Sequence, residues 1–296
     1  MRGGLEKALI EPLQLTAPLA RDYAIRFCRS GLAGPAGCFW YHGTWQYLRL
    51  LGLAASPERH AGFFGNAFES LAARGEFSRV MISGTADYSL LAHLLRAYGQ
   101  AGGRARTTII DRCETPLALC RWYAGRMSET VETIRAEALD YLPARPFDLI
   151  CTHSFLSRFP PAGRERLIAA WRAALRPGGR LITNTRLNPS WSEDQSGFSP
   201  LQAVEFGERA RLEAEARPGL IDLAPGEIAR LARQYALRSR NYSLGTEDEL
   251  RGLLIGGGFA IEHLGIAQLD GSFATGGSGP GTSQAARYAE IIARRV

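Results

Sequence analysis

The sequence predicts an α/β protein built on a parallel sheet that helices cover on both faces. From residue 79 onward, short apolar runs alternate with segments of helical periodicity, whereas no strand pattern precedes that residue. Hydrophobic residues make up 46% of the 296 residues and charged residues 22%, as in an ordinary globular protein. Strands that are separated by helices pair in parallel, and such a sheet is buried on both sides.

The N-terminal quarter is predicted to be helical. An apolar, aromatic segment covers residues 41–53, and Pro57 can occupy the first turn of a further helix. The Gly- and Pro-rich stretch 31–37 separates the first helix from the second. We therefore expect two units, a helical cap over residues 1–75 and a sheet domain over residues 76–296.

Five strands are predicted in the first part of the sheet domain. They cover residues 80–83, 107–110, 131–135, 147–152 and 181–185. Helices are expected between them at residues 88–98, 115–124 and 161–175. Thr115 followed by Pro116 is a good N-cap and first-turn pair for the second of these helices.

The C-terminal part adds an insertion at residues 186–244, after the fifth strand. Two helices are predicted inside it, at residues 200–216 and 225–235. Thr246 and Glu249 form a capping-box pattern that starts a helix ending near residue 255. The last two strands are expected at residues 259–264 and 287–292, with a Gly- and Ser-rich loop, residues 271–283, between them.

Composition and charge exclude several classes of protein. The net charge of +6 comes almost entirely from arginines, which are spread along the chain and often alternate with glutamates, as at residues 164–166. Without a run of basic residues, nucleic acid is disfavoured as a partner. The sequence shows no signal-peptide pattern and no apolar stretch long enough to cross a bilayer, so a cytoplasmic protein is expected.

Cysteine and histidine usage predicts no metal site. The five cysteines show neither CxxC spacing nor a paired framework, and the five histidines form neither HxxxH nor HxH. We expect the cysteines to be buried or half-buried thiols.

Two motifs give the sheet domain a family resemblance. The segment 137–143 after the third predicted strand follows an acidic–Ala–x–Asp–x–x–Pro pattern, and Phe-Asp-Leu-Ile at 147–150 precedes a helix that ends in Leu-Arg-Pro-Gly-Gly-Arg-Leu at 175–181. At this spacing the chain resembles the class I S-adenosylmethionine-dependent methyltransferases over about residues 76–296. The resemblance implies a seven-stranded Rossmann-like sheet, S-adenosylmethionine as cofactor and methyl transfer as the activity.

The resemblance also implies a set of cofactor-binding residues. Gly84 ends the first strand and lets the backbone approach a ligand. Asp111 ends the second strand, where it is placed to accept hydrogen bonds from the ribose hydroxyls. Glu137 and the Ala138 backbone lie where the family holds the adenine amino group. The full set expected to contact the cofactor is Gly84, Thr85, Ala86, Asp87, Asp111, Arg112, Glu137, Ala138 and His153.

The first glycine-rich loop departs from the family pattern. The family carries acidic–x–Gly–x–Gly–x–Gly, but residues 82–88 keep only Gly84 and have Ile82 at the acidic position. Ala86 is small enough to keep the backbone close, and Thr85 and Asp87 can offer polar contacts to the cofactor's amino group. The methionine half of the cofactor is therefore expected to be held in a different way.

The acceptor side is predicted from residues that follow the strands and from the cap. His153, after the fourth strand, has a side chain suited to act as a base, or to hydrogen-bond in the cofactor wall. The cap offers Trp40, Tyr41, His42 and Trp45, which can shape an acceptor pocket or simply pack against the core. Asn184, Arg186 and Trp191 leave the fifth strand, and an arginine there suits a carboxylate.

The function expected from these residues is methyl transfer to a small molecule at oxygen, nitrogen or a thioether sulfur. The absence of an Asn/Asp-Pro-Pro-Tyr motif argues against a DNA adenine methyltransferase. Two alternatives stay open, an RNA methyltransferase and a cofactor-binding protein of this fold with other chemistry or none. Homo-oligomerisation is compatible with the sequence.

Overall fold

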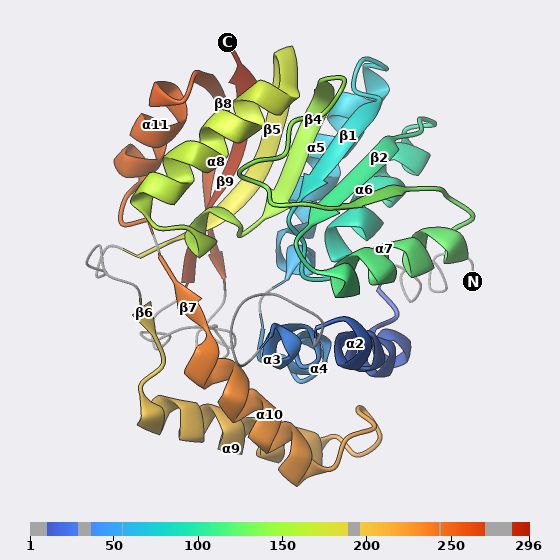
Figure 1. Cartoon of the computed structure of the whole chain (residues 1–296), viewed down its shortest axis with the longest axis vertical. Helices are drawn as coiled ribbons and strands as arrows, with labels where there is room; N and C mark the ends of the chain where they lie inside the picture. The colour runs from blue at the N-terminus through green and yellow to red at the C-terminus, as the bar shows by residue number, and fades with distance from the viewer. Residues whose placement is uncertain (1–10, 29–36, 55, 189–195, 243, 270–285) are drawn as a thin grey trace.

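The computed structural model describes residues 11–28, 37–54, 56–188, 196–242, 244–269 and 286–296. Its centre is a seven-stranded sheet with the order β3-β2-β1-β4-β5-β9-β8 (Figure 1). The strands are β1 (Arg79–Ser83), β2 (Arg106–Asp111), β3 (Glu132–Arg135), β4 (Phe147–His153), β5 (Leu175–Leu187), β8 (Phe259–Leu269) and β9 (Ala286–Arg295). The predicted fold class is confirmed.

Helices cover both faces of the sheet, as buried strands require. One face carries α5 (Ala61–Ala73), α6 (Ser89–Gln100) and α7 (Glu114–Arg126), and the other carries α8 (Pro161–Ala174) and α11 (Glu247–Gly256). Because α5 packs against α6, the last helix before β1 is part of the sheet layers.

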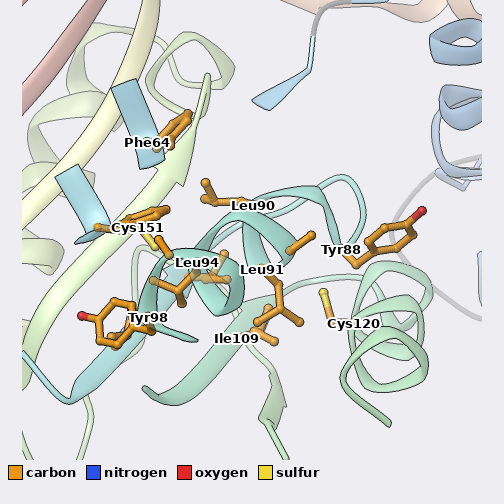
Figure 2. Packing of buried hydrophobic residues seen from close by; sticks show 14 of the residues in the cluster. Phe64, Tyr88, Leu90, Leu91, Leu94, Tyr98, Ile109, Cys120 and Cys151 are labelled. Carbon is orange, nitrogen blue, oxygen red and sulfur yellow. The ribbon is translucent and has the colours of Figure 1, made fainter. Parts of the chain in front are cut away.

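The core on the α6 side supports the loop that follows β1. Figure 2 shows Leu90, Leu91 and Leu94 of α6 among side chains from the strands and from α5 and α7. At the start of this helix the buried Tyr88 ring stacks on Tyr123 of α7, with the ring centroids 4.7 Å apart and the planes 4° from parallel. The packing holds the end of the Gly84 loop against the sheet.

A second helical layer lies beyond the carboxyl ends of the parallel strands (Figure 1). It contains α2 (Leu13–Phe27), α3 (Phe39–His42), α4 (Trp45–Leu50), α9 (Pro200–Ala216) and α10 (Pro225–Arg238). Buried side chains of α4 form one hydrophobic cluster with those of α9 and α10. Cap and insertion are thus one packed unit, which we call the lid, and the two-stranded ribbon of β6 (Ser196–Gly197) and β7 (Arg240–Asn241) joins it to the sheet domain.

Several element boundaries differ from the sequence-based ones. The sheet is not wholly parallel, because β9 runs antiparallel to both β5 and β8. The predicted Thr115 N-cap is wrong: α7 begins at Glu114, and the extended Cys113 occupies the cap position. Strands β5, β8 and β9 are longer than predicted. The antiparallel ladder of β9 accounts for the added length of β8 and β9 and for the C-terminal end of β5, whereas Leu175 at the start of β5 pairs with Phe147 of β4. The predicted loop at 271–283 and most of the break at 31–37 lie outside the described residues.

None of the helices in the described ranges is both long enough and apolar enough to span a bilayer.

Candidate cofactor and acceptor site

A cavity of about 290 Å³ lies between the carboxyl ends of the strands and the lid. This volume is at the lower end of the range for small-molecule pockets. Most of the residues predicted to bind cofactor or acceptor line it, namely Gly84, Thr85, Ala86, Asp87, Asp111, His153, Trp40, Tyr41, His42, Trp45 and Arg186. The fold therefore brings cap, sheet and insertion residues to one place.

Other predicted site residues lie outside the lining of this cavity. Arg112 and Glu137 form an ion pair at 3.1 Å beside the tips of β2 and β3, and Ala138 is buried next to them. Asn184 is fully buried, and its Oδ1 accepts a hydrogen bond from the Ser154 N–H at 3.0 Å. The Asn184 amide oxygen thus orients the turn after β4, and Trp191 is among the residues that the structure does not describe.

The turn after β1 requires glycine. Gly84 has φ +68°, and its N–H donates to the carbonyl oxygen of Ile110 at 2.9 Å. A Cβ built at this position would lie 2.5 Å from the Phe155 ring. The positive φ and the close ring explain why the only glycine retained from the family loop is this one.

Asp111 ties the tips of two strands together. One carboxylate oxygen accepts from the Thr85 N–H at 3.1 Å, and the other accepts from the Cys113 N–H at 2.8 Å. Burial raises the pKa of the Asp111 carboxyl to about 6. Each oxygen still has accepting capacity, so the carboxylate is oriented for hydroxyl donors in the cavity.

The carboxylate of Asp87 is engaged within the protein. Its Oδ2 accepts from Arg49 at 2.9 Å and from Gln46 at 3.1 Å, and its Oδ1 accepts from the Ser89 N–H at 2.9 Å. Arg49 forms a second ion pair with Glu11, and the side chains of all three charged residues are at most 7% exposed. This cluster of Glu11, Arg49 and Asp87, the buried ion triad, anchors the loop that follows β1.

His153 ends β4 with an unused ring nitrogen. Its Nε2 is buried and has no hydrogen-bond partner among the residues that the structure describes. Burial, and the nearby His60 ring at 5.8 Å between centroids, lower the pKa of His153 well below 6.5. The imidazole is therefore neutral at pH 7 and able to accept a proton or a hydrogen bond.

Aromatic side chains form the lid wall of the cavity. The rings of Tyr41, Trp45 and Tyr235 of α10 pack against one another, with the Tyr41 centroid 5.4 Å from Trp45 and 5.9 Å from Tyr235, and 6.3 Å between the last two. The Arg158 guanidinium carbon lies 5.3 Å from the centroid of the Tyr41 ring. Two arginines, Arg158 and Arg186, thus border an aromatic wall.

Sequence reasoning missed several lining residues, including Arg158, Phe155, Asn241 and Tyr288. Phe155 and Arg158 lie in the segment that directly follows His153, the last residue of β4. Their position after a strand end is the sequence feature from which they could have been predicted. Asn241 and Tyr288 come from β7 and β9, and nothing local in their sequence marks them.

Known proteins with similar sequences or folds include methyltransferases. Residues 88–183, from the N-cap of α6 into β5, match a family model described as a methyltransferase domain. Magnesium protoporphyrin IX methyltransferase (ChlM) from Synechocystis PCC 6803, solved with bound SAH, is 14% identical with a TM-score of 0.50, over 95% of this chain and 99% of that one. The [4+2]-cyclase SpnF is 14% identical with a TM-score of 0.50, over 78% of this chain and 80% of its own. No curated protein sequence matches the chain.

The sheet order, with its antiparallel β9 between β5 and β8, is that of the class I methyltransferase fold, which both solved structures share. Residues 88–183 are thus similar to a methyltransferase domain, and the chain has the fold of both solved structures.

Proposed function

We propose that the enzyme transfers the methyl group of S-adenosylmethionine to a small molecule enclosed between the strand tips and the lid. The observation that carries this proposal is that one cavity is bordered by Asp111 and Gly84 on the sheet side and by Tyr41 and Trp45 on the lid side. Methyl transfer from a sulfonium is an in-line displacement, so the protein mainly has to align the reactants and exclude water. An acceptor space closed by a packed lid favours a metabolite over a macromolecule.

The cofactor is proposed to lie along the strand tips. Asp111 accepts the ribose hydroxyls, and the Gly84 turn allows the backbone to pass close to the nucleoside. Glu137 and Ala138, at the adjacent tip of β3, flank the adenine. Thr85 and Ala86 contact the methionine half through their backbone, since the Asp87 carboxylate already has donors on both oxygens.

The acceptor is proposed to be planar and to carry an anionic group. Tyr41 and Trp45 give the space an aromatic lining, and Arg158 and Arg186 offer positive charge at its border. An oxygen or nitrogen acceptor would use His153 as a base or hydrogen-bond acceptor, whereas a thioether sulfur would need neither.

Isothermal calorimetry with S-adenosylmethionine and S-adenosylhomocysteine tests the cofactor site. Replacing Asp111 with alanine is expected to weaken binding of both ligands by about 1.5 to 3 kcal/mol, the value of a hydrogen bond to a charged group. Asp248→Asn removes an exposed carboxylate at the start of α11 and should leave both affinities unchanged. Equal affinity of the Asp111→Ala variant and the parent would show that the ribose lies elsewhere.

The acceptor can be found with methyl-labelled cofactor. The enzyme is incubated with metabolite extracts, and labelled products are identified by mass spectrometry. An anionic, planar product is the expected result. Label appearing only in RNA, with binding that falls steeply as salt rises, would favour the RNA methyltransferase instead.

A second candidate is a cofactor-binding enzyme of this fold that does not methylate. The buried ion triad favours it, because the loop that usually holds the methionine half is anchored to the lid by charge. Tight binding of S-adenosylmethionine without any labelled product would support this candidate.

A further inference from the structure

Four metal-binding side chains meet where the lid joins the sheet. Cys28 ends α2, Cys38 caps α3, His42 lies at the end of α3, and Cys113 caps α7. Their potential ligand atoms, three sulfurs and one imidazole nitrogen, all lie within 4.8 Å of one another. We call this set the Cys₃His cluster.

The distances within the cluster match the edges of a tetrahedron around one ion. The Cys28 and Cys113 Sγ atoms are 3.7 Å apart, the Cys38 and Cys113 Sγ atoms 3.4 Å, and Cys28 Sγ and His42 Nδ1 3.7 Å. A tetrahedral zinc ion with bonds of about 2.3 Å to sulfur separates its ligands by about 3.8 Å. Such spacing leaves room for one ion at the centre and none for a multinuclear cluster.

The backbone is adapted to bring these residues together. Gly37 has φ +43°, and a Cβ at that position would lie 2.2 Å from the carbonyl oxygen of Cys28. Only glycine therefore allows the chain to pass Cys28 closely enough to place Cys38 beside it. His42 follows Cys38 by one helical turn, so the two side chains share one face.

We propose that the Cys₃His cluster binds one structural zinc ion. Three thiolates and a neutral imidazole are a complete set of four protein ligands, which is the arrangement of structural rather than catalytic zinc sites. When the ion binds, the three thiols lose their protons to solvent and the sulfur lone pairs form the Zn–S bonds. Neither an oxidant nor a reductant takes part.

The surroundings of the cluster fit this role. Cys28, His42 and Cys113 are buried, and Cys38 is half-buried. The Thr115 hydroxyl lies 3.3 Å from Cys28 Sγ, where it can donate to a bound thiolate. This contact also gives Thr115 a function in place of the helix cap predicted from the sequence.

Zinc at this position would clamp the lid to the cofactor side of the sheet. Cys28, Cys38 and His42 belong to the lid, while Cys113 belongs to the segment after β2. The Cys113 N–H donates to the Asp111 carboxylate at 2.8 Å, so fixing Cys113 also fixes the proposed ribose-binding group. This last consequence rests on the proposed function, but the metal site itself does not.

The site is tested first by the metal content of the purified full-length chain, measured by inductively coupled plasma mass spectrometry without cofactor present. We expect about one zinc per chain, released by titration with p-hydroxymercuribenzoate as the thiols react. Cobalt substitution should give the visible absorption bands of a tetrahedral thiolate site. A chain that is purified without zinc, and that fails to take up zinc or cobalt after full reduction, would overturn the proposal.

Variants separate the cluster from the other thiols. Cys38→Ser changes the least buried of the three cysteines and is expected to lower zinc content to a small fraction of the parent value, whereas Cys38→His should retain the metal. Cys120→Ala, which removes a buried thiol of α7, the helix that Cys113 caps, should keep the full zinc content. Unchanged zinc in Cys38→Ser, or peptide mapping that finds a Cys38–Cys113 disulfide in the purified chain, would contradict the assignment.

The link to the cofactor has its own readout. Removing zinc with a chelator should weaken S-adenosylhomocysteine binding about tenfold, and adding zinc back should restore it. If the zinc-loaded protein fails to bind S-adenosylhomocysteine at all, the cofactor site is misassigned and the zinc site still stands. If zinc removal leaves the affinity unchanged, the clamp on Asp111 is contradicted.

Discussion

Replacing Arg49 with methionine is expected to lower the free energy of unfolding by about 3–5 kcal/mol, the usual cost of leaving a buried charge without its partner. Arg49 lies between Glu11 and Asp87, and its side chain is only 2% exposed. Methionine fills a similar volume but leaves the buried Asp87 carboxylate without a positive charge and Glu11 with only His93 beside it. Urea denaturation followed by circular dichroism measures the change.

Arg21→Met serves as the matched control. Arg21 of α2 forms an ion pair with Glu227 of α10, so it also connects two elements of the lid. Both side chains, however, are about a third exposed. Exposed pairs of this kind contribute no more than about 1 kcal/mol. Similar losses in Arg49→Met and Arg21→Met would show that the ion triad is not a buried network.

The ion triad also gives stability a pH dependence. Burial alone would raise the pKa of Glu11, but Arg49 and His93 more than offset it, so the pKa lies below 4.5 in the fold. The folded state then binds fewer protons than the unfolded chain as the pH falls below 4.5. The contribution of Glu11 is thus complete above that pH and is lost as the pH falls through its lowered pKa.

Replacing His153 with asparagine is expected to lower kcat by about 10²- to 10⁴-fold for an oxygen or nitrogen acceptor, the range for a lost general base. The unpartnered Nε2 borders the cavity, and asparagine keeps a polar side chain there but cannot take a proton. Steady-state kinetics with the acceptor found in the labelling screen measure the effect.

The pH profile of the parent enzyme adds an independent readout. The base acts in its neutral form, and burial lowers the pKa of His153, so kcat/KM should stay level as the pH falls through 6.5 and decline only well below it. His263→Asn changes an exposed histidine on β8 and should alter neither the rate nor the profile. A loss of less than about threefold in His153→Asn would rule out the base and point to a thioether acceptor.

Local sequence patterns predicted most of the sheet. Apolar runs predicted β1, β2 and β4. The glycine, aspartate or histidine at the end of each run was predicted to belong to the site, because strand ends in a parallel sheet converge on one edge. Gly84, Asp111 and His153 do border one cavity. The motif at 175–181 located β5 but not its start, since pairing with neighbouring strands, rather than local propensity, extends a strand through Pro-Gly-Gly.

Contacts between distant segments were beyond local patterns. The stacking of Tyr41 on Tyr235 joins positions far apart in the chain, and the lid exists only through such pairings. The Asp87 carboxylate was expected to face the cofactor but is bound by Arg49, a residue of the cap. A helical sequence pattern shows that one face of the helix is apolar, but it does not show which other helix or strand packs against that face.

The Cys₃His cluster shows most clearly the difference between what the sequence predicts and what only the tertiary structure reveals. The sequence predicted most of the strands, the polar residues at their carboxyl ends and the resemblance to a family, because these depend on periodicity and on motifs within short spans. Only the tertiary structure brought Cys28, Cys38 and His42 to Cys113, because the packing of α2 against α7 sets that distance. Spacing along the chain shows only that His42 follows Cys38 by one helical turn, since a ligand set drawn from three elements is defined by where those elements pack.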